Sequence, residues 1–414
     1  MNNSKRQTIY EALGREPVHP FPARMAPDIV LEVLGNSKKP LRVLDPMMGS
    51  GTVLAVARAR GHKAFGVDID PLAVLIARVW TTTIDQDEVH RAAKMVMIRA
   101  QAAFKELTVR DAYPRYANRS TREFVRYWFD NRARRQLTAI ANCISRVRNS
   151  DVRDVLWCAF SRLIIVKQAG ASLAMDLAHS RPHKTFSVAP AKPFDKFLSS
   201  VDRVLANCIQ SSEGGRGPAT IVKIGDARNL LFRSSSFDLV VTSPPYLNAI
   251  DYMRCSKFSL VWMGFNVDEL RTLRGASVGA ERRRNSSDEE DTEIEDILRG
   301  LKLKPALNKR DRQILARYIG DMRKSISEAA RMLRPGGRAV YVVGENTVKG
   351  TYIRNSVIVS KAGEIAGLRL CERSVRNLPA NRRYLPPPKK SRCHLASLDT
   401  RMRHEVILVF QKAA

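Results

Sequence analysis

The segment Leu41-Arg-Val-Leu-Asp-Pro-Met-Met-Gly-Ser-Gly-Thr52 decides the fold of this 414-residue chain. Leu41–Asp45 predicts a short buried strand, and the glycines after it predict a tight turn into a helix over about Gly51–Arg60. Lys63–Ile69 predicts a second strand, and Asp70-Pro71 predicts the start of a second helix, because proline is tolerated in the first helical turn. Strands that alternate with helices of this length favour a parallel sheet and an α/β fold.

Strand patterns return in the second half of the chain. A helix is expected over about Arg312–Leu333, and a glycine of Arg334-Pro-Gly-Gly337 is expected to cap it in the left-handed conformation. The sequence shows no internal repeat. Five further segments bring the expected number of strands to seven: Thr220–Gly225, Phe237–Thr242, Ala339–Val343, Leu368–Glu372 and Val406–Phe410.

The stretch between the two halves has a different character. Residues 85–215 show no clear strand alternation, so we interpret them as a mainly helical insertion into the α/β core. Within them, residues 110–148 hold ten arginines against three acids, interleaved with aromatic side chains. Residues from about 275 to 300 contain three consecutive arginines and then a run of acids, and they are expected to form a mobile charged loop.

The overall composition limits the possible functions. Hydrophobic residues make up 44% of the chain, which is enough for a substantial core and excludes wholesale disorder. Lys and Arg total 70 and Asp and Glu total 41, so the formal charge is +29. Such a charge favours a polyanionic partner such as a nucleic acid, although a proteome biased towards basic proteins would also produce it.

The sequence gives no sign of a membrane or a metal. No apolar run approaches the roughly 18 residues of a membrane span, and the first residues lack the apolar stretch of a signal peptide, so a cytoplasmic location is expected. Six widely spaced cysteines form no C-x-x-C pair, so we expect neither a zinc site nor a disulfide framework.

The glycine-rich turn is the first candidate binding element. Gly49 and Gly51 would let the backbone approach a ligand at the carboxyl edge of the sheet, although a plain tight turn would need them too. The lysine of a phosphate-binding loop is missing. Asp68, at the end of the second strand, could accept both hydroxyls of a ribose, whereas Asp70 is explained as a helix N-cap. Asp226, after the third strand, could meet an adenine amino group or serve only as a turn residue.

Thr242-Ser-Pro-Pro-Tyr246 is the most specific motif. Two prolines at the end of a buried strand stop the ladder and fix an extended backbone. The Ser243 hydroxyl and the Pro244 carbonyl then become rigid acceptors beside the aromatic ring of Tyr246. This set suits a planar heterocycle that carries an exocyclic NH2 group, although a rigid turn with a packing tyrosine is the simpler interpretation.

Together these motifs resemble the amino-group DNA methyltransferases. Asp45-Pro-Met-Met-Gly-Ser-Gly-Thr52 is similar to their S-adenosylmethionine motif, and Thr242–Tyr246 is similar to their catalytic motif in the form associated with cytosine-N4 enzymes. His19–Pro27 resembles the segment that precedes the cofactor motif. Weaker similarities are Asn248–Tyr252, Leu333–Gly337 and Asn381–Pro386. Met47 departs from the family, which often has an aromatic residue there.

The resemblance implies a Rossmann-like methyltransferase fold with a mainly parallel seven-stranded sheet and a large helical insertion. It also implies a cofactor, S-adenosylmethionine, without a metal, and a double-stranded DNA partner, with a cognate restriction endonuclease as a further possible partner. The implied catalytic residues are Ser243, Pro244, Pro245 and Tyr246. The implied cofactor-binding residues are Phe21, Pro22, Asp45, Pro46, Gly49, Gly51, Thr52, Asp68, Asp226 and Thr242.

The implied reaction is methylation of the N4 amine of a flipped-out cytosine. Adenine-N6 methylation, methylation of an RNA amino group and a catalytically dead DNA-binding homologue remain as alternatives. A carbon-5 cytosine mechanism is disfavoured, because no Pro-Cys pair supplies its thiolate.

The resemblance also divides the chain into three parts. Residues 1–84 would form the cofactor-binding half of the core, 85–215 a target-recognition or DNA-binding insertion, and 216–414 the catalytic half with a basic C-terminal region. We expect residues 110–148 and 369–403, the latter with ten Lys or Arg against two acids, to contact DNA phosphates.

Overall fold

The computed structural model describes residues 7–21, 24–37, 39–178, 182–211, 217–247, 253–279, 292–348, 350–378 and 404–414. Several predicted features lie outside these residues and are not discussed structurally. They are Pro22, the segment Asn248–Tyr252, residues 280–291 of the predicted mobile loop, residues 379–403 of the basic C-terminal region and, within them, Asn381–Pro386.

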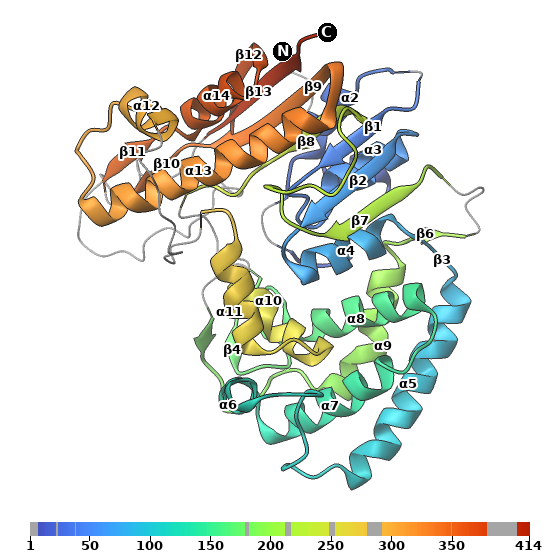
Figure 1. The fold of residues 1–414 in the computed structure, drawn as a ribbon. Coiled ribbons are helices and arrows are strands. Elements are labelled where there is room, and N and C mark those ends of the chain that lie inside the picture. The colour runs from blue at the N-terminus through green and yellow to red at the C-terminus, as the bar shows by residue number, and fades with distance from the viewer. Residues whose placement is uncertain are drawn as a thin grey trace.

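One seven-stranded sheet forms the upper part of the molecule in Figure 1, with the strand order β12-β13-β9-β8-β1-β2-β7. Neighbouring strands from β7 to β9 are parallel, whereas β13 is antiparallel to both β9 and β12. The chain therefore has the Rossmann-like methyltransferase fold that the sequence predicts. The strands are β1 (Arg42–Asp45), β2 (Lys63–Asp68), β7 (Thr220–Ile224), β8 (Phe237–Thr242), β9 (Leu333–Gly344), β12 (Leu368–Asn377) and β13 (His404–Lys412).

Helices cover both faces of this sheet. Because successive side chains of a strand point to opposite faces, Val340 and Val342 pack on one side and Ala339, Tyr341 and Val343 on the other. The first side is covered by α2 (Pro27–Leu34), α3 (Thr52–Ala59) and α4 (Pro71–Thr81). The second is covered by α12 (Thr292–Gly300), α13 (Lys309–Met332) and α14 (Asn355–Ile365). We call the sheet with these helices the sheet body.

A second layer, which we call the helical body, lies below the sheet body in Figure 1. Its helices from the predicted insertion are α5 (Gln86–Glu106), α6 (Arg119–Trp128), α7 (Asn131–Ile144), α8 (Ser150–Ile164) and α9 (Pro193–Leu205). Three later elements share its core: α10 (Met253–Leu260), η1 (Val261–Met263) and α11 (Val267–Ala276). The helical body thus combines the predicted insertion with a segment from the predicted catalytic half.

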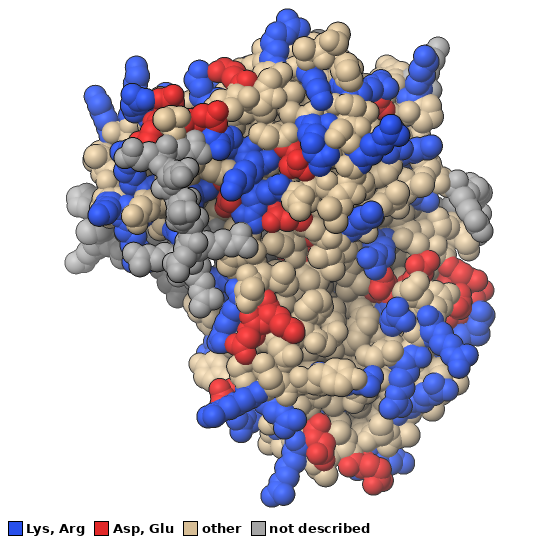
Figure 2. Space-filling model, viewed as in Figure 1, with Lys and Arg blue, Asp and Glu red and all other residues tan. Residues whose placement is uncertain are grey.

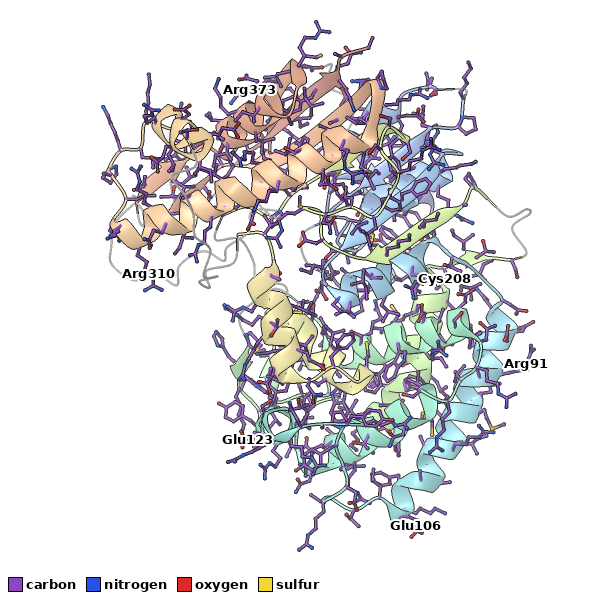
Figure 3. The ribbon with its side chains drawn as sticks, viewed as in Figure 1. Arg91, Glu106, Glu123, Cys208, Arg310 and Arg373 are labelled. Carbon is purple, nitrogen blue, oxygen red and sulfur yellow. The ribbon has the colours of Figure 1, made fainter. Side chains whose placement is uncertain are left out.

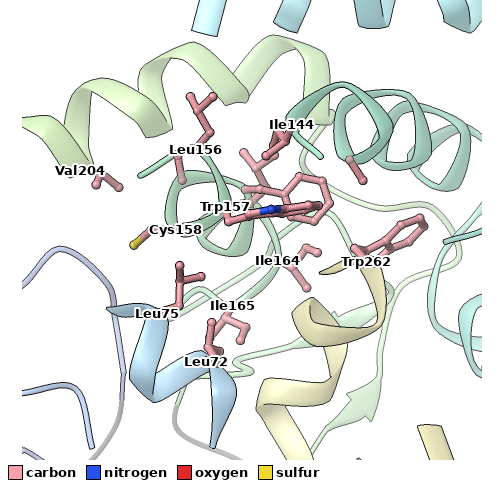
Figure 4. Close-up of a cluster of buried hydrophobic side chains, with 14 of the residues drawn as sticks. Leu72, Leu75, Ile144, Leu156, Trp157, Cys158, Ile164, Ile165, Val204 and Trp262 are labelled. Atoms are coloured by element: carbon pink, nitrogen blue, oxygen red, sulfur yellow. The ribbon is translucent and has the colours of Figure 1, made fainter. Parts of the chain in front are cut away.

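Helix α4 joins the two bodies. Val74 and Ala77 face the sheet, whereas Leu72 and Leu75 pack into the core of the helical body. Figure 4 shows these two leucines beside a buried cluster that includes Trp157 and Trp262. An α4 that is apolar on both sides explains why the two bodies form one continuous structure.

Short elements complete the fold. They are α1 (Ile9–Leu13), β3 (Thr83–Ile84), which pairs with β6 (Ile209–Gln210), β4 (Ala174–Met175), which pairs with β5 (His183–Lys184), and β10 (Asn346–Val348), which pairs with β11 (Thr351–Ile353).

The predicted glycine cap of the long helix was wrong. Helix α13 ends at Met332, its C-cap Leu333 is already extended, and the strand begins there. Gly336 is left-handed, with φ +73°, but it lies within β9, where the pairing with β8 shifts register. The glycine therefore serves an irregularity of the strand rather than the end of the helix.

Candidate functional site

The turn after β1 depends on two glycines for different reasons. Gly49 has φ +50° and Gly51 has φ +85°, and residues that carry a side chain rarely adopt this left-handed backbone conformation. A Cβ at Gly51 would also lie 2.8 Å from the Cβ of Ala77 in α4. A Cβ at Gly49 would lie 3.7 Å from the ring of Phe21, which places that buried ring against the turn. The turn is therefore both tight and closely packed.

Asp68 ties this turn to the end of β2. Its carboxylate accepts hydrogen bonds from the Gly49 N–H at 2.8 Å and from the Asp70 N–H at 2.9 Å. Asp70 caps α4 by accepting from the Leu72 N–H at 2.9 Å, which confirms its predicted N-cap role. The two loops at the carboxyl ends of β1 and β2 are thus held together by backbone donors.

The Ser-Pro-Pro-Tyr corner, residues 243–246, lies directly beside this turn. Strands β1 and β8 are parallel neighbours, and the Thr242 hydroxyl at the end of β8 donates to the Asp45 carboxylate at 2.7 Å. Both residues are buried. The structure therefore brings the two motifs that the sequence singled out to one edge of the sheet.

The corner is held from several sides. The Ser243 hydroxyl donates to the Val342 carbonyl of β9 at 3.0 Å and lies 3.3 Å from the Tyr246 hydroxyl. The Tyr318 hydroxyl of α13 donates to the Pro245 carbonyl at 3.1 Å. Burial raises the pKa of Tyr318, so this hydroxyl stays a neutral donor. These bonds fix the direction of the backbone where the β8 ladder ends.

Three carboxyl groups share the β1–β2 edge. Burial raises the pKa of Asp45 to about 7 and that of Asp70 to about 7, and the charge of nearby Asp68 adds to both shifts. Burial also raises the pKa of Asp68. Since these acids disfavour each other's ionisation, a ligand that brings positive charge to this edge would stabilise their ionised forms.

Asp226 lies at the same edge but is already engaged. Its carboxylate accepts from the Arg228 guanidinium at 2.6 Å, and the ion pair raises the pKa of Arg228. Arg228 also donates to Asp321 of α13 and to the Ala276 carbonyl at the end of α11, both at 2.5 Å. Asp226 therefore belongs to an ion-pair network that links the end of β7 to α13 and α11.

The remaining predicted residues lie around the turn. Pro46 is buried immediately after Asp45. Thr52 is the first residue of α3 and is also buried, and its hydroxyl has no hydrogen-bond partner among the described residues. Phe21 comes two residues after His19, whose Nε2 is hydrogen-bonded to the Ser161 hydroxyl at 2.9 Å; Ser161 in turn donates to Ser259 at 2.9 Å. Burial holds the pKa of His19 well below its usual value, so the ring is neutral.

Two buried serines of α10 were not predicted from the sequence, and one of them, Ser256, joins the helical body to the sheet body. Ser256 of α10 donates to the Asp70 carboxylate at 2.6 Å, and Ser259 lies one turn further on. Both serines are buried. Their spacing of three residues on a helix that otherwise buries apolar side chains is the signal that could have revealed them.

Many arginines of residues 110–148 have structural partners. Arg134 is buried and donates to the Tyr113 hydroxyl at 2.9 Å and to the Val109 carbonyl at 3.2 Å. Arg135 donates to the Leu107 and Phe104 carbonyls. Their charge therefore helps to hold the helical body together, and the assignment of this region to DNA contact stays a prediction.

Exposed basic side chains are distributed over both bodies. On the face shown in Figure 2, Lys and Arg side chains are spread over the upper and lower parts rather than gathered in one patch. Arg310 at the start of α13 and Arg373 on β12 are exposed on the sheet body, and Arg91 is exposed on the helical body (Figure 3). Net charge alone therefore does not locate a nucleic-acid surface.

Within the described ranges, no group of three or more His, Cys, Asp or Glu side chains could hold a metal ion. Among the helices of the described part of the chain, none is both long and apolar enough to cross a membrane.

Comparison with known proteins gives two curated relatives, while no family model matches. The type II methyltransferase M.MvaI of Kocuria varians is 25% identical over 422 residues, which cover 95% of this chain and 90% of that protein. The type II methyltransferase M.BsoBI of Geobacillus stearothermophilus is 23% identical over 273 residues, which cover 60% of this chain and about half, 52%, of that protein. The chain is thus similar to one type II methyltransferase over nearly its whole length and to a second over 60% of its length.

A solved structure of a methyltransferase is also similar. The S-adenosylmethionine-dependent methyltransferase of Methanosarcina mazei is 9% identical, with a TM-score of 0.32 and coverage of 92% of this chain and 97% of that one. The fold assignment rests on the strand order and directions of the sheet described above.

Proposed function

We propose that this protein is a DNA methyltransferase that transfers the methyl group of S-adenosylmethionine to the exocyclic N4 amine of a cytosine. The observation that carries the proposal is the 2.7 Å hydrogen bond from Thr242 to Asp45, which fixes the Ser-Pro-Pro-Tyr corner against the glycine turn. A methyl donor held by the turn and an amine held by the corner would lie side by side. The full-length similarity to a type II methyltransferase supports a DNA substrate.

The residues around the turn fit this cofactor. Asp68 would accept ribose hydroxyls, and a cationic ligand would stabilise the ionised form of the buried acid Asp45. When bound, S-adenosylmethionine supplies a methyl group on a positively charged sulfur. We assign the cofactor contacts to Phe21, Pro22, Asp45, Pro46, Gly49, Gly51, Thr52, Asp68, Asp226 and Thr242.

The corner would activate the amine without a metal or a covalent nucleophile. Because the Ser243 hydroxyl donates its proton to the Val342 carbonyl, its lone pairs can accept a hydrogen from the target NH2. The Pro244 carbonyl would accept the second hydrogen, which favours a pyramidal nitrogen, and Tyr246 would stack on the flipped base. Held in this way, the amine would point its lone pair at the methyl group that the bound cofactor supplies, and the amine would release one proton to solvent.

The serine at the first position of the corner favours cytosine N4 over adenine N6. An RNA substrate is the second candidate, and a core that binds DNA without turnover is the third. A cognate restriction endonuclease is a further proposed partner, because both curated relatives are type II methyltransferases.

One assay separates these possibilities. The protein is incubated with labelled S-adenosylmethionine and either mixed-sequence duplex DNA or RNA, and the methylated nucleosides are identified by mass spectrometry. We expect N4-methylcytosine in DNA. N6-methyladenine would overturn the choice of base, label in RNA alone would overturn the choice of substrate, and no label in either would overturn the assignment as an enzyme.

A further inference from the structure

A pocket of about 240 Å³ opens in the helical body, and no residue of the glycine turn lines it. Its floor is apolar and aromatic and includes Trp128 and Phe258, whose rings meet edge to face at a centroid distance of 5.0 Å. Its walls carry four basic side chains. The lining residues are Trp128, Pro182, Met253, Arg254, Lys257, Phe258, Val267, Leu270, Arg271 and Arg274, and no acid is among them.

The four cations come from two neighbouring helices with the same spacing. Arg254 and Lys257 are three residues apart on α10, and Arg271 and Arg274 are three residues apart on α11. Residues three apart on a helix lie on one face, so each helix turns two like charges towards the same hollow.

The surroundings define which ligand these cations suit. Arg271 lines the pocket while paired with Asp268 at 2.8 Å, and its side chain is 60% exposed. Lys257 is partly buried, and its ammonium lies over the Phe124 ring at 5.1 Å. An aromatic floor with cationic walls suits the sugar–phosphate backbone of a nucleic acid, because the sugar can pack on the floor while the walls neutralise the phosphates.

The chain connection places this pocket near the catalytic corner. Met253, the first residue of α10, follows Leu247 by six residues, so the two cannot be more than about 20 Å apart. The rise of a DNA strand is about 3.4 Å per nucleotide, so this distance spans at most about six base steps. A strand whose base lies in the corner would pass the pocket within that distance.

We infer that this pocket binds backbone phosphates of the DNA strand that carries the target base, a role that rests on the proposed function. The site deepens that function by placing a DNA contact on α10 and α11, outside the basic stretches 110–148 and 369–403. It contributes affinity and register rather than base identity, because phosphates carry no sequence information.

The test compares two pairs of basic residues with the same spacing. The first variant is Arg271→Gln/Arg274→Gln, whose side chains are both exposed, so the fold should be retained. The matched control is Arg91→Gln/Lys94→Gln, an exposed pair with the same spacing on α5, remote from the pocket lining. Binding to a fluorescent mixed-sequence duplex is measured by anisotropy from about 0.05 to about 0.3 M salt, the range in which the affinity of phosphate contacts depends strongly on salt. The recognition sequence need not be known.

We expect the pocket variant to weaken DNA binding at least about tenfold near physiological salt and to reduce the slope of log K against log salt by about 2, while the control changes neither. Thermal unfolding and S-adenosylmethionine binding should stay unchanged in both variants. An unchanged slope, or an equal effect of the control pair, would overturn the inference. A competition experiment gives a second way to overturn it. If inorganic phosphate at constant ionic strength displaces DNA from the wild-type protein but not from the pocket variant, the pocket is a site for small anions.

The wild-type methylation assay keeps the two proposals distinguishable. If the wild-type protein methylates nothing but the pocket variant still loses DNA affinity, the phosphate site stands and the catalytic assignment fails. If DNA is methylated and the pocket variant binds like wild type, the catalytic assignment stands and the phosphate site fails.

Discussion

The carboxyl edge of the sheet and the pocket of the helical body differ in charge and in how their residues are brought together. The edge gathers three buried acids: Asp45 and Asp68 are the last residues of β1 and β2, and Asp70 lies two residues beyond β2. The pocket gathers four cations from two helices that meet only after folding. The first region suits a cationic small molecule and the second a polyanion. Methyl transfer and DNA backbone binding are therefore assigned to separate bodies of the molecule.

The largest expected effect is loss of turnover at the edge. Ser243→Ala removes the proposed acceptor for the target amine, and loss of one preorganised polar group of this kind costs about 100- to 1,000-fold in turnover. S-adenosylmethionine affinity, measured by calorimetry, should change less than about threefold, since Ser243 bonds to Val342 and Tyr246 rather than to the glycine turn. Ser199→Ala, an exposed serine on α9, is the control. Wild-type turnover in the Ser243 variant would refute the role of this hydroxyl.

The second effect concerns the packing of the glycine turn. Gly51→Ala would place a side chain on a left-handed backbone and against Ala77. We therefore expect the free energy of unfolding, measured in urea, to fall by about 3 kcal/mol. Gly61→Ala is a matched control, because Gly61 has φ +81° but no atom within 4 Å of its added Cβ. The control should lose only about 1–2 kcal/mol. Equal losses in the two variants would show that the contact with α4 is unimportant.

The third effect is a pH dependence that the buried acid should cause. The pKa of Asp45 is about 7 in the folded protein and 3.8 as its ordinary value, so between these values the folded state holds the proton more tightly than the unfolded state. Stability without ligand therefore falls as pH rises through this window, by about 2 kcal/mol between pH 5 and pH 7 for this group.

Asp45→Asn should remove that part of the pH dependence of stability, because an amide does not titrate. The local structure should be kept, because the amide oxygen can still accept hydrogen bonds from Thr242 and Met47. Unfolding by urea at several pH values measures it. Asp195→Asn, an exposed residue on α9, should leave the slope unchanged. If the Asp45 variant keeps the wild-type slope, a group other than Asp45 causes the pH dependence of stability. A positively charged cofactor should reduce the slope in the wild-type protein.

The sequence predicted the edge better than the pocket for a physical reason. The motifs at Asp45–Thr52 and Thr242–Tyr246 each combine a buried strand with the turn that follows it, so their placement depends on local pattern and on parallel pairing. All seven strands were expected, and β8 was predicted with its correct ends. The glycine cap of α13 failed because left-handed glycines serve both helix ends and strand irregularities, and only the pairing of β9 decides between them.

The pocket had no comparable signal. Arg254, Lys257, Arg271 and Arg274 are separated by η1 and a turn, and their convergence depends on how α10 packs against α11. Arg134 and Arg135 lie in the richer basic stretch, yet the fold uses both in backbone and side-chain hydrogen bonds. A count of charges cannot separate an arginine that supports a helix from one that faces a ligand.

The smallest expected effect lies where the two regions meet. Ser256 on α10 donates to Asp70 at the edge, and this bond favours the ionised carboxyl. Ser256→Ala should therefore cost about 1 kcal/mol of stability at pH 5 and about 2 kcal/mol at pH 8, because a hydrogen bond to a charged group is the stronger one. The pKa of Asp70 should rise further in this variant. A cycle with Asp70→Asn isolates the pair, and in the Asn background the serine substitution should cost the same at both pH values. If the loss in the Asp background is also independent of pH, Ser256 acts only as a packing residue, and the helix of the DNA-binding pocket is not coupled to the acids of the edge.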